Sequence, residues 1–126
     1  MEKLKVLMID DDRDFLELVK MNLEATGRFS VRTEDKGSAG LAAALVFKPD
    51  LILLDVVMGD ESGSYVASRL RNNLETNAIP IIYLSGIVKN EEKVMIDEFL
   101  GGCSVLAKPV STEKLIAVIE ETVSKD

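Results

Sequence analysis

Histidine is absent from this chain of 126 residues, and cysteine occurs once, at position 103. Without histidine the chain has no imidazole for acid–base catalysis, for metal binding or for an internal phosphohistidine. Serine-hydrolase chemistry is excluded for the same reason, because a serine nucleophile would lack its histidine base. A single cysteine excludes an internal disulfide and a zinc site built on cysteines.

Long hydrophobic runs are also absent: although 47% of the residues are hydrophobic, none of the runs reaches the roughly 18 residues that a membrane span requires. The first residues, MEKLKV, lead directly into an apolar run and lack the architecture of a signal peptide. A formal charge of -7 and a pI near 4.7 disfavour a nucleic-acid or acidic-membrane surface. We therefore expect one soluble cytoplasmic domain over residues 1–126.

Short apolar runs alternate with longer segments of helical periodicity, which is typical of βαβ units and a parallel sheet. Asp12 and Ser38 are candidate N-caps for the first two helices. The pattern predicts an α/β fold of five strands (6–9, 29–33, 51–54, 81–84 and 105–107) and five helices (after Asp12, 39–47, 65–74, 91–100 and after Ser111 or Thr112).

Polar residues stand directly after four of the apolar runs. They are Asp10 and Asp11 after the first run, Asp55 after the third, Ser85 after the fourth and Lys108 after the fifth. The carboxyl ends of parallel strands share one edge of a sheet, and ligands of open α/β sheets bind there, so we expect these side chains to converge. Carboxylates, a hydroxyl and an ammonium together suit a divalent cation and a phosphoryl group.

Each of these residues has an ordinary structural interpretation as well. An aspartate run is usually a solvated or helix-capping segment, but Asp10 and Asp11 follow an apolar run without a turn and would repel each other unless protonated or neutralised by a cation. Asp55 can be a helix cap, a metal ligand or a nucleophile that forms an aspartyl phosphate. Ser85 can be a turn residue or a donor to a phosphoryl oxygen. Lys108, held before Pro109, can be a surface lysine or the partner of Asp55 or of a phosphate.

Taken together, these motifs resemble the receiver domain of two-component response regulators. The resemblance rests on Ile9–Asp12, Pro49–Met58, Gly63, Ser85–Gly86 and Lys108–Pro109, in order and over essentially the whole chain. It implies a flavodoxin-like three-layer αβα sandwich whose parallel strands are ordered 2-1-3-4-5.

The resemblance also implies roles for the residues of the site. Asp11 would bind Mg²⁺ directly and Asp10 partly through water, with Mn²⁺ as an alternative ion. The full implied set is Asp55 as phosphoacceptor, Asp10, Asp11, Asp55 and the backbone carbonyl of Val57 as metal ligands, and Ser85 and Lys108 as phosphoryl-binding residues.

A phosphorelay switch of this kind implies external partners. Because the chain lacks histidine, the phosphoryl donor would be a sensor histidine kinase or a histidine phosphotransfer protein. A downstream effector protein or domain would read the changed surface. The domain would assist its own phosphorylation and slow dephosphorylation, and we expect no turnover of a separate substrate.

The chain departs from the family pattern at several positions. Gly59 stands where proline is usual, which predicts a looser loop beside the acceptor. Val105 replaces the aromatic residue of the switch and output face. Val57 and Ile87, two residues after Asp55 and Ser85 respectively, are both apolar and cannot orient an attacking water, which predicts slow self-hydrolysis.

Three other classes of protein share part of this pattern: an interaction module, a phosphatase and a flavodoxin. A receiver-like interaction module that works without phosphorylation would be expected to have lost an acidic residue or the lysine, and this chain keeps both. A magnesium-dependent phosphatase with an aspartyl nucleophile would usually carry a second aspartate at the position of Val57. Flavodoxins share the implied fold, but no phosphate-cradling loop follows the first strand.

Overall fold

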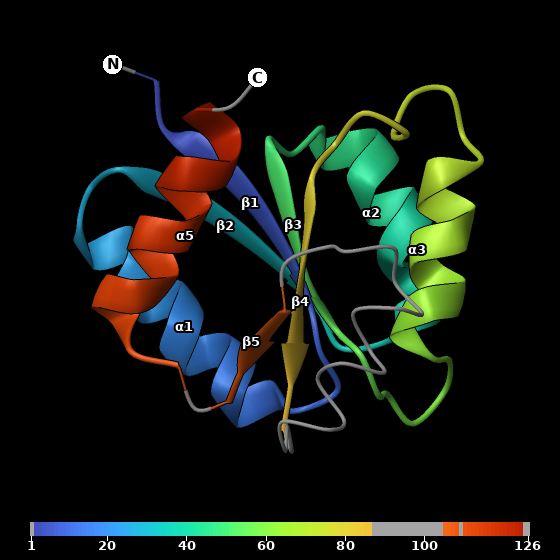
Figure 1. Cartoon of the computed structure of the whole chain (residues 1–126), viewed down its shortest axis with the longest axis horizontal. Coiled ribbons are helices and arrows are strands. Elements are labelled where there is room, and N and C mark those ends of the chain that lie inside the picture. The colour runs from blue at the N-terminus through green and yellow to red at the C-terminus, as the bar shows by residue number, and fades with distance from the viewer. Residues whose placement is uncertain (1, 87–104, 109, 125–126) are drawn as a thin grey trace.

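Five parallel strands form one sheet in the order β2-β1-β3-β4-β5 (Figure 1). The computed structural model describes residues 2–86, 105–108 and 110–124. The sheet confirms the expected flavodoxin-like strand order. Its strands are β1 (Leu4–Ile9), β2 (Phe29–Glu34), β3 (Leu51–Asp55), β4 (Ile81–Ser85) and β5 (Val105–Ala107).

Helices cover both faces of this sheet and make the expected three-layer sandwich. In Figure 1, α1 and α5 lie on one face, and α2 and α3 lie on the other. The helix expected over 91–100 lies outside the described residues. The described helices are α1 (Arg13–Ala25), the 3₁₀ helix η1 (Gly37–Ala39), α2 (Gly40–Phe47), α3 (Gly63–Arg71) and α5 (Thr112–Ser124).

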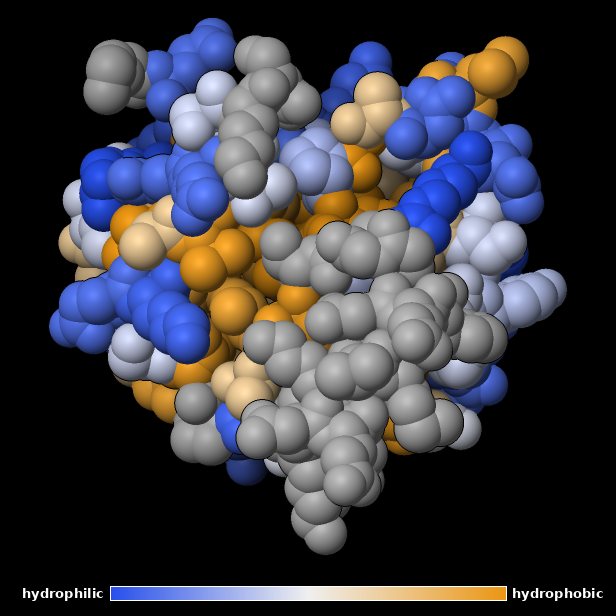
Figure 2. Space-filling view, viewed as in Figure 1, coloured by the Kyte–Doolittle hydropathy of each residue, from blue (hydrophilic) through white to orange (hydrophobic). Residues whose placement is uncertain are grey.

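The central strand β3 is buried along its whole length because it lies between two helical layers. Alternate residues serve the two cores: Leu53 packs in the cluster of α1 and α5, and Leu54 packs in the cluster of α2 and α3. In Figure 2, apolar residues gather between α5 and the strands, while hydrophilic residues cover the outer surface of the helices. This double burial holds the carboxyl end of β3 firmly in place.

Two of the predicted helix starts are observed. The Phe15 amide donates to Asp12 Oδ1 over 3.1 Å, so Asp12 caps α1 as expected. The Lys114 amide donates to Ser111 Oγ over 3.2 Å at the start of α5, which favours Ser111 over Thr112 as the cap. These caps satisfy amides that have no partner inside a helix.

The predicted cap at Ser38 is wrong. Ser38 lies inside η1, and α2 starts after Ala39 without a side-chain cap. The Ser38 amide instead donates to the carboxylate of Asp60 over 3.1 Å. A contact across 22 residues of sequence therefore replaces the local one.

Helix α3 is displaced relative to the predicted range of 65–74. It starts at Gly63, where Ser62 accepts from the Tyr65 amide over 3.3 Å. It ends at Arg71, and the Thr76 hydroxyl donates to the carbonyl of Leu70 over 2.5 Å. The chain turns away there, so Leu74, the last residue of the predicted helix, is 91% exposed.

Among the described residues, no helix has both the length and the apolar character that crossing a membrane requires.

Candidate functional site

The carboxyl edge of the sheet collects three carboxylates. Oxygen atoms of Asp10, Asp11 and Asp55 lie within 4.8 Å of one another. The register that pairs Ile9 with Leu54 explains this arrangement, because it places the residues that follow β1 beside the last residue of β3. The three-carboxylate cluster is therefore a direct result of the parallel strand order.

Asp10 is completely buried at this edge. Its Oδ1 accepts the Asp12 amide over 2.9 Å, and its Oδ2 forms an ion pair with the ammonium of Lys108. A buried carboxylate needs such partners, because an uncompensated charge in the interior is strongly destabilising. The folded domain can therefore keep the charge of Asp10 buried only because Lys108 offsets it.

Lys108 is positioned by the backbone and by an aromatic ring. Its amide donates to the carbonyl of Ser85 over 2.8 Å, which continues the pairing of β5 with β4. Its Nζ lies 3.5 Å from Asp55 Oδ2 and 4.7 Å from the centre of the Phe15 ring. An ammonium over a ring face is attracted to it. Phe15 lies in the helix predicted after Asp12, and the sequence pattern did not indicate its contact with Lys108.

Asp55 ends β3 and is 4% exposed. Its Oδ1 accepts the Val57 amide over 3.3 Å. Burial, followed by the nearby charge of Asp10, raises the pKa of the Asp55 carboxyl to about 6, although Lys108 acts in the opposite direction. A divalent cation at the cluster would favour the charged form of this carboxyl, so the donor set fits such an ion.

Asp11 differs from its neighbours because it is exposed. Its Oδ2 accepts the amide of Gly59 over 2.9 Å. A cavity of about 320 Å³ adjoins both residues, so one side of the carboxylate is open. Hard oxygen ligands with room for water are what Mg²⁺ prefers. The cavity is lined by Asp11, Arg13, Asp35, Lys36, Gly59 and Asp60.

Gly63 allows the loop after β3 to fold back onto the strand. Its amide donates to the carbonyl of Val56 over 2.8 Å. A Cβ at this position would lie 2.2 Å from the carbonyl oxygen of Asp55 and 2.9 Å from the Cα of Val56. No side chain fits in that space, so this glycine sets the path of the chain beside Asp55.

The other predicted site residues lie at or near this edge. Ser85 is 6% exposed and follows Leu84, which is paired with Asp55. The side chain of Val57 is 74% exposed. The expected roles of the Ser85 hydroxyl and of the Val57 carbonyl stay predictions, and Ile87 lies outside the described residues.

Val105, the expected output-face residue, is buried in β5 and pairs with Tyr83 of β4. Tyr83 is fully buried in the same apolar cluster. An aromatic ring is therefore present beside the position where the family residue is missing. The sequence showed Tyr83 only as part of an apolar strand.

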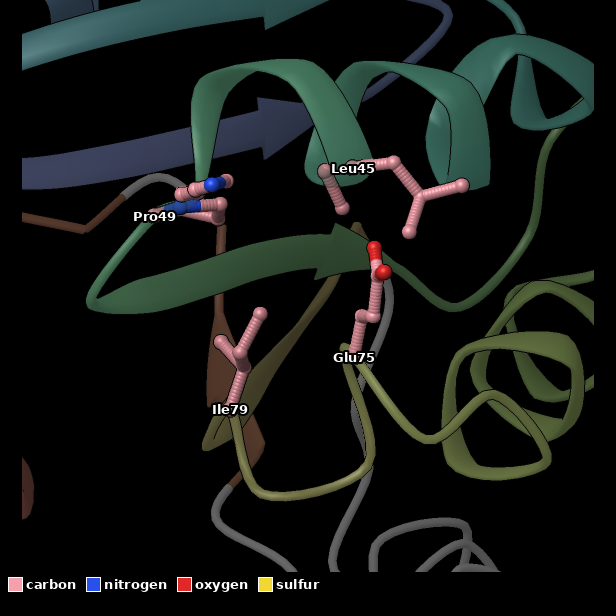
Figure 3. Close-up of a pocket in the computed structure, with 6 residues that line it drawn as sticks. Leu45, Pro49, Glu75 and Ile79 are labelled. Carbon is pink, nitrogen blue, oxygen red and sulfur yellow. The ribbon is translucent and has the colours of Figure 1, made fainter.

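A separate cavity of about 420 Å³ lies at the amino ends of β3 and β4, the edge opposite to Asp55 (Figure 3). In Figure 3 the carboxylate of Glu75 points toward α2, while Leu45, Pro49 and Ile79 supply apolar walls. Its position separates it from the carboxylate cluster, so it takes no part in that chemistry.

The family model for the response regulator receiver domain matches residues 6–120. The chain belongs to this family. Receiver domains are signalling domains of two-component systems and not enzymes that turn over a separate substrate, and this one serves as a phosphoacceptor switch. The match does not favour a phosphorylation-independent module. The acidic cluster of this receiver domain also agrees with the Mg²⁺ site that such domains generally have.

Relatives with known names support the assignment. The receiver domain is 34% identical over 113 residues to the DNA-binding dual master transcriptional regulator RpaA of Synechocystis, covering 90% of this chain and 46% of that protein. It is 32% identical over 122 residues to the nisin biosynthesis regulatory protein NisR of Lactococcus lactis, covering 97% and 51%. The chain thus spans about half the length of the curated relatives it matches.

Solved structures agree with the fold. The chemotaxis protein CheY4 of Vibrio cholerae superposes with a TM-score of 0.83 and 27% identity, covering 95% of this chain and 98% of that one. A response regulator from Chloroflexus aurantiacus gives a TM-score of 0.85 with 25% identity, covering 98% and 99%. The receiver domain therefore has the whole fold of these proteins.

Proposed function

We propose that Asp55 accepts the phosphoryl group in a switch domain formed by residues 1–126. The observation that carries this proposal is the position of Asp55: it ends the central strand, lies within 4.8 Å of Asp10 and Asp11, and has the ammonium of Lys108 3.5 Å away. Asp10 is buried beside the same ammonium, but its two oxygens are already engaged by the Asp12 amide and by Lys108, which favours Asp55 as the acceptor.

The same carboxylates would hold a divalent cation. Asp10, Asp11, Asp55 and the backbone carbonyl of Val57 are the proposed ligands for Mg²⁺, with Mn²⁺ as an alternative. When bound, the ion supplies positive charge that offsets the oxygens of a transferring phosphoryl group. The raised pKa of Asp55, caused by burial and by Asp10, supports a cation at this position, because the cluster has more carboxylates than ammonium groups.

The protein groups around Asp55 would divide the work of phosphoryl transfer. A carboxylate oxygen of Asp55 attacks phosphorus, the new O–P bond forms, and the N–P bond of an external phosphohistidine breaks. Lys108, already beside Asp55, offsets charge on the phosphoryl oxygens. The Ser85 hydroxyl donates to one of those oxygens and shifts an equilibrium between surface states.

The partners follow from the same chemistry. The donor is a sensor histidine kinase or a histidine phosphotransfer protein, because this chain has no histidine of its own. A downstream effector reads the face that includes Val105. The net charge of -7 supports a domain that itself binds neither nucleic acid nor a membrane. We place the domain in the cytoplasm on the basis of its family.

Intact-mass measurement after incubation with a small-molecule phosphodonor tests the assignment. We expect one phosphoryl adduct that requires Mg²⁺ and is lost in Asp55→Ala. Asp50→Ala is the matched control, because Asp50 is an exposed aspartate just before the amino end of the same strand. An adduct that persists in Asp55→Ala would move the acceptor elsewhere. No adduct in the folded wild type would favour a module that binds partners without phosphorylation.

A further inference from the structure

The amide of Gly59 is the sole hydrogen-bond donor to the Asp11 carboxylate within the described part of the chain. The bond runs from the Gly59 nitrogen to Asp11 Oδ2 over 2.9 Å and connects residues 48 positions apart. Asp11 is exposed, so nothing in the core holds its side chain in one orientation. The single amide therefore decides how this carboxylate is presented to the site.

The Gly59 amide is itself held in place by its neighbours. The carboxylate of Asp60 accepts the amides of Gly37 and Ser38 over 3.0 and 3.1 Å. These two bonds attach the loop after β3 to η1 and lower the pKa of the Asp60 carboxyl to about 2. The adjacent amide is therefore pre-positioned before any ion arrives.

A second pair of contacts attaches the same loop to α3 and η1. Arg69 forms an ion pair with Glu61 at 2.5 Å, and its guanidinium donates to the carbonyl of Gly37 over 3.2 Å. The loop expected to be loose because it lacks proline is thus held by the side chains of Asp60 and Glu61, which directly follow Gly59. Its rigidity comes from contacts and not from a constrained backbone angle.

We propose that the Gly59 amide is a positioning group for the cation site: it holds Oδ2 of Asp11 and leaves Oδ1 for the ion. The inference rests on the proposed role of Asp11 as a metal ligand. Hydrogen bonds to ligating carboxylates orient them, and loss of such a bond typically weakens metal affinity by about 10- to 100-fold. Proline, which has no N–H, cannot make this bond, so glycine gives this receiver domain a link that a proline there would remove.

Two substitutions at one position separate the amide from the side chain. Gly59→Pro removes the N–H, whereas Gly59→Ala keeps it and adds a Cβ that would lie 3.6 Å from Asp11 Oδ2, an ordinary contact. We expect Gly59→Pro to weaken Mg²⁺ binding by about tenfold and Gly59→Ala to bind as the wild type does. Affinity is measured by following backbone amide resonances during titration with MgCl₂, which needs no phosphorylation.

A double substitution tests whether the effect passes through Asp11. In an Asp11→Asn background, Gly59→Pro should cause no further loss of affinity. If the proline still weakens binding there, the amide acts by another route and the inference is wrong. Should the proline variant fold poorly, a semisynthetic chain with glycolic acid in place of Gly59 removes the N–H without adding a side chain, and the same loss is expected.

The outcomes distinguish this inference from the proposed function. A wild type that binds no Mg²⁺ would overturn the proposed cation site together with the positioning role. A wild type that binds Mg²⁺, with Gly59→Pro or the ester variant binding equally well or more tightly, would leave the cation site intact and overturn only the role of Gly59.

Discussion

The ammonium of Lys108 lies 3.5 Å from the carboxylate of Asp55 and at the same time pairs with the buried carboxylate of Asp10. One cation therefore serves two acidic groups at the carboxyl ends of the neighbouring strands β1 and β3. Asp11 adds a third carboxylate to the cluster. The excess negative charge ties the stability of the site to Lys108 and to any divalent cation that binds there.

Lys108→Met should destabilise the metal-free domain by about 3 kcal/mol, because Asp10 would be left buried without its cation. Mg²⁺ should restore part of this loss by supplying positive charge. Urea unfolding with and without MgCl₂ measures both effects. Lys114→Met, at an exposed position of α5, is the control and should change stability little. A Lys108→Met protein as stable as this control would contradict the dependence of Asp10 on Lys108.

Asp55 should make the stability of the metal-free domain fall as the pH rises. Burial and Asp10 raise the folded pKa of this carboxyl to about 6, above its ordinary value of 3.8, so the folded state binds the proton more tightly than the unfolded state does. This contribution is fully present below about pH 4 and is lost as the pH passes 6. Asp55→Asn should therefore be more stable than the wild type at pH 7.5, by on the order of 3 kcal/mol, and most of the difference should be gone near pH 4.

Thermal unfolding across this pH range, in the presence of a chelator, measures the difference. Asp50→Asn is the control for loss of a carboxyl, because Asp50 is exposed and precedes the other end of β3. A stability difference between Asp55→Asn and the wild type that does not change between pH 4 and 7.5 would contradict the raised pKa.

Gly63→Ala should disturb the strand end, because the new Cβ would lie 2.2 Å from the Asp55 carbonyl oxygen. The Asp55 oxygen is a backbone atom and cannot rotate away as a side chain could. We therefore expect the free energy of unfolding to fall by about 2–3 kcal/mol. Gly86→Ala is the matched control, since a Cβ there meets nothing within 4 Å. Denaturant midpoints compare the two variants. Equal midpoints would mean that the loop after β3 can move away at little cost.

Val57→Asn should speed the loss of the phosphoryl group from Asp55, since an amide can orient an attacking water and valine cannot. The Val57 side chain is 74% exposed, so the change should leave the fold intact. We expect a rate increase of about tenfold or more. Decay of the phosphoryl adduct by intact mass, in the absence of any phosphatase, measures the rate. Val46→Asn, 75% exposed on α2, is the control, and a fast decay in the wild type would contradict the prediction.

The order of apolar runs and the polar residues that end them were enough to predict the parallel sheet and the placement of Asp10, Asp11, Asp55 and Lys108 on one edge. Short apolar runs that alternate with helical segments indicate buried parallel strands, and this alternation can be read from neighbouring residues. The packing of Lys108 over Phe15 was not predictable in this way, because it joins β5 to the start of α1.

Hydrogen bonds that the sequence pattern did not indicate also explain why the predicted cap at Ser38 and the predicted end of α3 were wrong. Serine is a common N-cap residue, so Ser38 was predicted to cap a helix, and the pattern up to Leu74 predicted a later end of α3. In the structure Asp60 and Thr76 form competing hydrogen bonds. The bond from Gly59 to Asp11 likewise spans 48 residues. Sequence alone determined which elements form and which chemical groups end them, because these follow from neighbouring residues. Only the tertiary structure decided which donor meets which carboxylate, because those distances depend on how distant loops pack.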